Sequence, residues 1–293
     1  MIKRQRGEKM LTTTVQMLKK AYAGHYAVPA INTQGGTYDM IRAICLAAEE
    51  LRSPIILAHY TSTAAYSGHE WFYETAKWMA EQVSVPVAVH LDHGISLEEC
   101  VQMLKIGFTS IMFDGSMLSV EDNARATNEI LKICHAVEVP VEAEIGELAR
   151  LDDQGRLTGS SNKADPDLVK KYLDLCQPDS LAISIGNAHG FYKGEVDIDV
   201  EILEKCREFT DIPFVLHGCT GMDEKLIRRS LNCGVAKINF GTQLRYQYVR
   251  YLEEGLKNGI DQGHAWKLSQ YASDSLKEDI KKIILLAGSE GKT

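Results

Sequence analysis

The sequence predicts a single (β/α)8 barrel of the TIM type, and three observations lead to this fold class. Eight short runs rich in Val, Ile, Leu and Ala recur about every 25 to 40 residues, with amphipathic helical segments between them. Most of these runs are apolar throughout, as strands buried on both faces of a parallel sheet are. A length of 293 residues is also the usual size of one such barrel. An open doubly wound sheet would need a glycine-rich first turn, and no G-x-G-x-x-G follows the first run.

The apolar runs are expected to be the barrel strands. In chain order they are Tyr26 to Ile31, Ile55 to Ala58, Val85 to His90, Ser110 to Phe113, Val139 to Ile145, Ser180 to Ile185, Phe214 to Leu216 and Val235 to Ile238. Helices are expected between them, several of which begin at Asp or after Ser, the residues that cap helix N-termini. These helices are Asp39 to Arg52, His69 to Gln82, Leu97 to Ile106, Val120 to His135, Asp165 to Cys176, Asp199 to Thr210 and Asp223 to Cys233.

Residues 10–293 are expected to form one TIM-barrel domain, because no linker rich in Pro, Ser or Gly divides them. Residues 1–9, MIKRQRGEK, are polar and are expected to be a disordered leader. The longest polar stretch, Ala149 to Lys163, follows the fifth strand. It is interpreted either as a surface loop or as a mobile active-site flap.

The composition restricts the classes of partner. A formal net charge of −8 disfavours nucleic acid and anionic membrane surfaces, so a phosphate must be held by a local site. Seven cysteines without a Cys-x-x-Cys spacing argue against a disulfide framework and a zinc knuckle, and favour a cytoplasmic location. No apolar run approaches the roughly 20 residues of a membrane-spanning helix. A small anionic substrate remains as the expected partner.

Polar side chains gather where the expected strands end, on the face where barrel enzymes place their active sites. They are Asn32, Asp92, His93, Asp114, Glu144, His189, His217, Asn239 and Thr242. Three of them, His93, His189 and His217, come from three different strands, and each is followed by Gly. Three imidazoles with a fourth position open are typical of catalytic zinc. His90, inside the third strand, is interpreted as structural.

The loops after the last three strands are expected to bind phosphate. Backbone N–H groups can approach an anion where no side chain intervenes, and these loops carry Gly190 with Lys193, Gly218 with Thr220, and Asn239 with Thr242. The loops after strands seven and eight are the habitual phosphate site of this barrel.

Six segments of this chain closely resemble the class II fructose-bisphosphate and tagatose-bisphosphate aldolase family. They are HLDHG (90–94), FDGS (113–116), VEAEIG (141–146), SLAISIGNAHGFYKG (180–194), VLHGCTG (215–221) and GVAKINFGT (234–242). The resemblance runs from about Leu11 to Lys292, in the order of motifs that the family has. Gly241 stands where fructose-bisphosphate enzymes carry an aspartate, so the chain is more similar to the tagatose-bisphosphate branch.

The resemblance implies a zinc-dependent aldolase, a carbon–carbon lyase of carbohydrate metabolism that releases dihydroxyacetone phosphate and an aldehyde reversibly. It implies one catalytic Zn²⁺ per subunit on His93, His189 and His217, which would stabilise the charge formed when a proton leaves carbon beside a carbonyl. Asp92 matches the catalytic acid. Asp114 and Glu144 match carboxylates around the metal and could form a second metal position.

The same resemblance implies a substrate site. The residues that match the phosphate and donor site, or lie beside it, are Asn32, Gly190, Lys193, Gly218, Thr220, Asn239 and Thr242. A monovalent cation often accompanies this phosphate site in the family. The family places the proton-abstracting acid on a mobile loop, where Asp152 and Asp153 are alternatives that stay open. A homodimer or homotetramer is expected.

Two departures from the family pattern affect the substrate. Tyr60 stands where the family has a small hydroxyl residue that meets the distal phosphate, and the stretch 264–271 lacks the arginine of a DPR-like motif. An acceptor aldehyde other than glyceraldehyde 3-phosphate, such as an unphosphorylated sugar-derived one, is therefore expected.

Two other classes of function compete with the aldolase interpretation. A metal-dependent barrel hydrolase, or another lyase, is the first, but such hydrolases commonly take a His-x-His pair from strand one, where this chain has PAIN. A non-catalytic barrel is the second, and it would be expected to have lost a zinc ligand or the catalytic acid, all four of which are present.

Overall fold

The computed structural model of the protein describes residues 10–63, 66–146, 149–151, 157–158, 163–190 and 197–293. Eight parallel strands close into a barrel in the order β1-β11-β10-β8-β5-β4-β3-β2, which confirms the predicted fold class. The strands are β1 (Val28–Asn32), β2 (Ile55–Tyr60), β3 (Val87–Gly94), β4 (Ser110–Phe113), β5 (Val141–Ile145), β8 (Ser180–Ile183), β10 (Phe214–Leu216) and β11 (Val235–Phe240). The expected leader, residues 1–9, lies outside the described residues.

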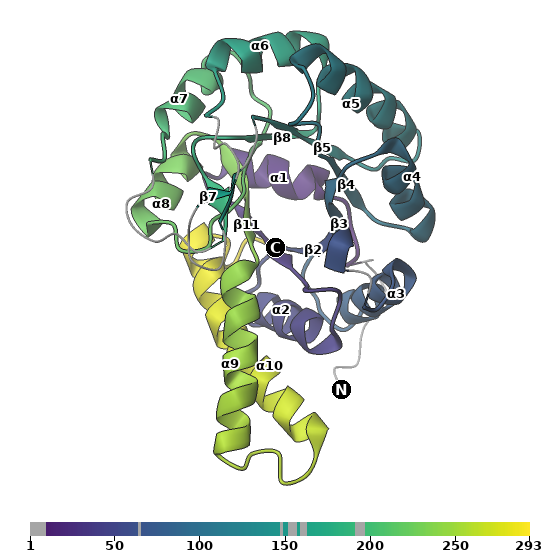
Figure 1. The fold of residues 1–293 in the computed structure, drawn as a ribbon, viewed down its shortest axis with the longest axis vertical. Coiled ribbons are helices and arrows are strands. Elements are labelled where there is room, and N and C mark those ends of the chain that lie inside the picture. The colour runs from purple at the N-terminus through teal and green to yellow at the C-terminus, as the bar shows by residue number, and fades with distance from the viewer. Residues whose placement is uncertain (1–9, 64–65, 147–148, 152–156, 159–162, 191–196) are drawn as a thin grey trace.

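An outer layer of helices surrounds the barrel, as Figure 1 shows. They are α2 (Tyr38–Glu50), α3 (His69–Ala80), α4 (Leu97–Ile106), α5 (Val120–His135), α6 (Pro166–Leu175), α7 (Glu201–Arg207) and α8 (Glu224–Asn232). Helix α4 illustrates how local sequence sets the ends of these helices. The Ser96 side chain caps its start by accepting from the Glu99 N–H, and Gly107 terminates it in the left-handed conformation, with φ 117°. No helix in the described part of the chain is long and apolar enough to cross a membrane.

Successive strand residues alternate between two apolar layers. Ile55 and Leu57 of β2 pack outward into the main core under the helices, whereas Ile56 between them belongs to a smaller core inside the barrel. Helix α1 (Thr14–Ala23) packs Met17 and Leu18 into this inner core and so closes the amino-terminal end of the barrel. The site must therefore lie at the other, carboxyl end.

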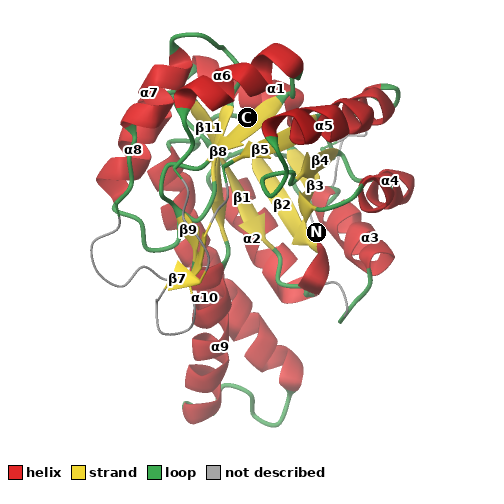
Figure 2. Cartoon of the chain, turned by 45° about the horizontal axis from the view of Figure 1, so that its top comes forward, coloured by secondary structure: helices red, strands yellow, loops and turns green. Residues whose placement is uncertain are grey.

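Several features of the structure were not among the predicted elements. Helix α9 (Thr242–Lys257) and the beginning of α10 (Ala265–Ala287) form an arm that projects from the barrel in Figure 1, whereas the rest of α10 packs into the main core through Leu276, Ile280 and Ile284. The polar stretch after β5 is partly a sheet, because β6 (Ala149–Leu151) pairs antiparallel with β7 (Leu157–Thr158) and parallel with β9 (Ala188–His189). Figure 2 shows this small sheet outside the barrel strands. A short 3-10 turn, Thr61–Thr63, follows β2.

Candidate active site

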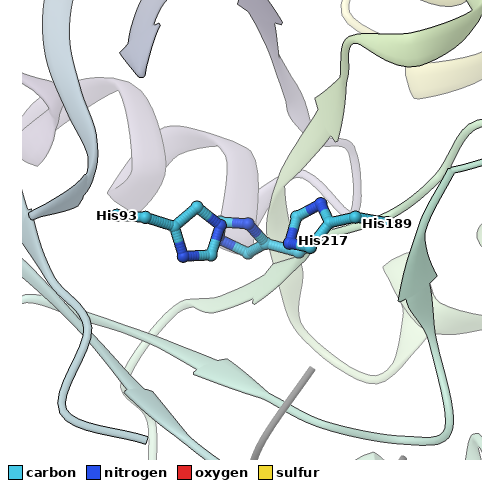
Figure 3. A group of neighbouring side chains, drawn as sticks. All are labelled: His93, His189 and His217. Atoms are coloured by element: carbon cyan, nitrogen blue, oxygen red, sulfur yellow. The ribbon is translucent and has the colours of Figure 1, made fainter. Parts of the chain in front are cut away.

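The three predicted histidines meet at the carboxyl end of the barrel. His93 ends β3, His189 belongs to β9, and His217 follows β10. Their ring centroids are 4.8 Å (His93 to His217), 4.9 Å (His93 to His189) and 5.9 Å (His189 to His217) apart. One ring nitrogen from each lies within 4.8 Å of the others, and Figure 3 shows the three rings facing one another. Small ring rotations would let one ion bind all three.

An irregularity of β3 directs His93 into the site. The register between β3 and β4 shifts between Leu91 and Gly94. His93 adopts a backbone φ of 56°, a value that residues other than Gly rarely adopt. Such bulges re-aim a side chain at the end of a strand, and the strained backbone is held by its surroundings. The Asp114 N–H donates to the Gly94 carbonyl at 2.8 Å, which fixes the strand beyond the bulge.

The loops carrying His189 and His217 are tied to each other. Gly218 has φ 66°, and a Cβ there would lie 2.3 Å from the Ala188 carbonyl oxygen, so only glycine allows this approach. The Asn187 amide donates to the His217 carbonyl oxygen at 2.9 Å, and its own oxygen accepts from the Ile185 N–H at 2.9 Å. These contacts hold the two histidine loops side by side.

Two of the histidines have a carboxylate on the ring nitrogen that points away from the cluster. His93 Nδ1 lies 2.8 Å from Asp114 Oδ2, and His217 Nε2 lies 2.9 Å from Glu142 Oε1. Metal-binding histidines commonly make this second hydrogen bond, which fixes the tautomer. It leaves His93 Nε2 and His217 Nδ1 for an ion. His93 Nε2 is buried and has no hydrogen-bond partner among the described residues, so this donor set fits zinc.

The electrostatics of the cluster favour a positive charge beside His93, which a bound metal ion would supply in place of the ring proton. Burial opposes protonation, but the hydrogen bond to Asp114 and the charges of Asp92 and Glu144 raise the pKa of His93 to about 10. Burial and the nearby Asp114 raise the pKa of Glu144 well above its usual value. Burial and the neighbouring His93 hold the pKa of His217 well below its usual value, which keeps this imidazole neutral, as a metal ligand must be.

Asp92 and Asn239 lie beside the histidine cluster. The Asn239 amide donates to Asp92 Oδ1 at 3.2 Å and its nitrogen lies 3.3 Å from His217 Nδ1. Asp92 is only 6% exposed, and it belongs to neither group of described residues that could hold an ion. A carboxyl group in this place can exchange a proton with a substrate oxygen near the cluster.

The other predicted site residues divide into two groups. Asn32 ends β1 beside Gly241, where an added Cβ would lie 3.1 Å from the Asn32 Cβ, and Asn32 Oδ1 accepts from the Gln34 backbone and side chain at 2.9 Å. Thr220 follows His217, Thr242 begins α9, and Gly190 follows His189 with φ 126°. Lys193, Asp152 and Asp153 lie outside the described residues.

Two buried charges that act on this cluster were not among the predicted residues. Glu142 was not singled out, although it alternates with Glu144 in the otherwise apolar β5. Lys237 was not singled out either, although it is a lysine inside the apolar run Val235 to Ile238. A charged residue within a fully buried strand was the signal that could have found both.

Comparison with known proteins gives matches over nearly the whole chain. The family described as fructose-bisphosphate aldolase class-II matches residues 12–292. The YdjI aldolase from Escherichia coli K12 is 29% identical, with a TM-score of 0.83 over 96% of this chain and 99% of its own. A putative fructose-1,6-biphosphate aldolase from Coccidioides immitis is 28% identical, with a TM-score of 0.83 over 96% and 98%. The fructose-bisphosphate aldolase of Campylobacter jejuni, 22% identical over 97% of both chains with a TM-score of 0.82, shares the fold.

Proposed function

This chain belongs to the class II fructose-bisphosphate aldolase family and is an aldolase, and we propose that the cluster of His93, His189 and His217 is its catalytic zinc site. Zinc dependence is general for the family. The observation that carries the assignment is the convergence of three histidines from separate loops, two of them with a carboxylate behind the ring. A zinc ion held there would act as a Lewis acid on a substrate carbonyl.

Asp92 is the proposed general acid and base. Its buried carboxyl group lies next to the cluster, where a substrate oxygen would carry the charge that develops during cleavage. In cleavage Asp92 accepts the hydroxyl proton, and in condensation it returns that proton. Asn239 orients Asp92 through its amide and keeps a second polar atom, Oδ1, for the substrate.

Dihydroxyacetone phosphate is the proposed product at the donor end. Gly190, Gly218 and Thr220 border the loops that hold the histidines, and Thr242 supplies the N-terminus of α9, where a helix favours an anion. Asn32 lies beside Gly241, the residue before Thr242. Lys193 and a monovalent cation are proposed as further partners of the phosphate on the family resemblance alone.

Two further sites are proposed for metal and proton transfer. Asp114 and Glu144 are the proposed second metal position, and their ligand atoms lie within 4.8 Å of each other and of His93, next to the first position. Asp152 or Asp153 is proposed as the base that removes the donor proton. Both stay alternatives, because both lie outside the described residues.

The acceptor aldehyde is proposed to lack a phosphate. Tyr60 ends β2, and its ring lies edge-on to that of His93 with the centroids 6.2 Å apart, so a bulky phenol borders the site where the family has a small hydroxyl residue. The other departure, residues 264–271, lies around the start of α10 at the far end of the arm in Figure 1. The acceptor proposal therefore depends mainly on Tyr60.

A cytoplasmic homo-oligomer is the proposed form of the enzyme. All seven cysteines are buried and free of disulfides, as in a reducing compartment. The arm exposes several large apolar side chains to solvent, which a second copy of the chain would cover: Tyr246, Val249, Leu256 and Trp266. Sedimentation of the wild type and of a Val249→Glu, Trp266→Glu double variant tests this proposal. We expect the wild type to sediment as an oligomer and the variant as a monomer, and a wild type that sediments as a monomer would refute the proposal.

One experiment tests the proposed function as a whole. Zinc content is measured, and dihydroxyacetone phosphate is assayed with a panel of aldehydes before and after treatment with a chelator. We expect about one catalytic zinc per subunit, activity that disappears on chelation, and recovery on addition of zinc. Full activity in protein freed of metal would refute the zinc site.

A further inference from the structure

A buried ion pair crosses the interior of the barrel beneath the proposed metal site. Lys237 on β11 is 0% exposed and Glu142 on β5 is 2% exposed. The Lys237 ammonium lies 2.9 Å from Glu142 Oε1 and 2.7 Å from Oε2, so it contacts both carboxylate oxygens. The neighbours of both residues on their strands are buried and mostly apolar. The barrel could be filled at these positions without any charge.

The ion pair is part of a chain of contacts through the barrel. Above it, Glu142 Oε1 lies 2.9 Å from His217 Nε2. Below it, the Lys237 ammonium lies 3.1 Å from His90 Nε2, and His90 Nδ1 lies 2.8 Å from the Ser110 hydroxyl. Ser110 in turn contacts the Thr14 hydroxyl of α1 at 3.1 Å. This series of contacts therefore connects α1, the helix that closes the barrel, to His217, one of the proposed zinc ligands.

The donor and acceptor capacities of the groups around the ion pair fix which nitrogen carries the proton in His90 and in His217. A lysine ammonium only donates, so His90 Nε2 must accept and His90 Nδ1 must carry the proton that it donates to Ser110. A carboxylate only accepts, so His217 Nε2 must carry its proton. The lone pair of His217 is then on Nδ1, the nitrogen on the side of Asn239 and the cluster.

A buried ion pair seldom stabilises a fold more than apolar residues of the same volume would, so stability alone gives no reason for this one. Its position gives another reason. We propose that Lys237 is a positioning residue, which holds the Glu142 carboxylate so that His217 presents Nδ1 to the metal. The inference rests on the proposed zinc site. Lys237 acts here through Glu142 and contacts neither metal nor substrate.

Zinc affinity in competition with a chromophoric chelator tests the role of Lys237. We expect Lys237→Met to weaken zinc binding by about 10- to 100-fold, as loss of a partner behind a ligand does. The visible spectrum of the cobalt-loaded protein should change with it, because the orientation of one ligand changes. Thr14→Val, at the far end of the same chain of contacts, is the control and should keep the wild-type affinity within about twofold.

A double variant separates positioning from folding. Lys237→Met combined with Glu142→Gln removes both buried charges, so it should fold even where the single lysine variant does not. If Lys237 and Glu142 act as one unit, the zinc affinity of the double variant falls by no more than that of the more affected of the two single variants, Lys237→Met and Glu142→Gln. Additive losses, or native zinc affinity in a folded Lys237→Met or double variant, would overturn the inference. A wild-type protein that binds no zinc would instead overturn the proposed function.

Discussion

Replacing Asp92 by Asn should separate metal binding from catalysis. Asn has nearly the same volume and keeps an oxygen that can accept from the Asn239 amide, now 3.2 Å from Asp92 Oδ1. The change in stability should therefore stay near the roughly 1 kcal/mol of one neutral hydrogen bond. General acid–base catalysis by this side chain is lost, because a carboxamide is neither protonated nor deprotonated to any useful extent at neutral pH. General acid–base groups contribute about 10²- to 10⁴-fold, so the activation free energy should rise by about 2.7 to 5.4 kcal/mol.

Three measurements on Asp92→Asn and the wild type test this role. The kcat for cleavage should fall by that factor, zinc content should stay the same, and the urea midpoint should hardly change. Asp122→Asn, an exposed carboxylate on α5, is the control and should keep wild-type kcat. Normal turnover in Asp92→Asn would show that another group moves the proton. Loss of zinc together with activity would instead show that Asp92 supports the metal.

Three further predictions follow from the site and the core. His217→Ala should lose zinc and turnover together, and zinc analysis showing full occupancy would contradict its role as a ligand. A ketose 1-phosphate should have a kcat/KM about 10 to 100 times that of fructose or tagatose bisphosphate, as expected where a phosphate loses a charge-assisted partner. A preference for either bisphosphate would show that another residue holds the distal phosphate. Burial raises the pKa of five thiols to about 12, those of Cys45, Cys100, Cys134, Cys206 and Cys219. In the unfolded chain these thiols ionise from about pH 9, so the unfolded state binds fewer protons and stability is lost as pH rises from about 9 towards 12. The free energy of unfolding should fall between about pH 8 and pH 10.5, by up to about 1.4 kcal/mol per thiol and pH unit, and less steeply in Cys45→Ala. The urea midpoint should fall with it. Equal midpoints at the two pH values would contradict this.

Much of the barrel follows from local patterns in the sequence. The runs Ser110 to Phe113 and Phe214 to Leu216 have the same bounds in the structure as β4 and β10, because a strand buried on both faces is apolar throughout and short. Helices α4 and α5 also begin and end as predicted, since Ser96 and Ser119 cap them. Local patterns did not reveal the sheet of β6, β7 and β9. Its strands are very short, and β6 pairs with β9, which lies far along the chain.

The sequence by itself determined which residue types stand at the carboxyl ends of the strands, and therefore that three histidines and several carboxylates share one face of the barrel. Only the tertiary structure decided which nitrogen of each ring is turned towards the others. That choice depends on the bulge at His93, on the approach of Gly218 to Ala188, and on Glu142 behind His217. Such contacts join residues up to 75 positions apart, and their geometry depends on how strands pack around a closed barrel, which no local periodicity encodes.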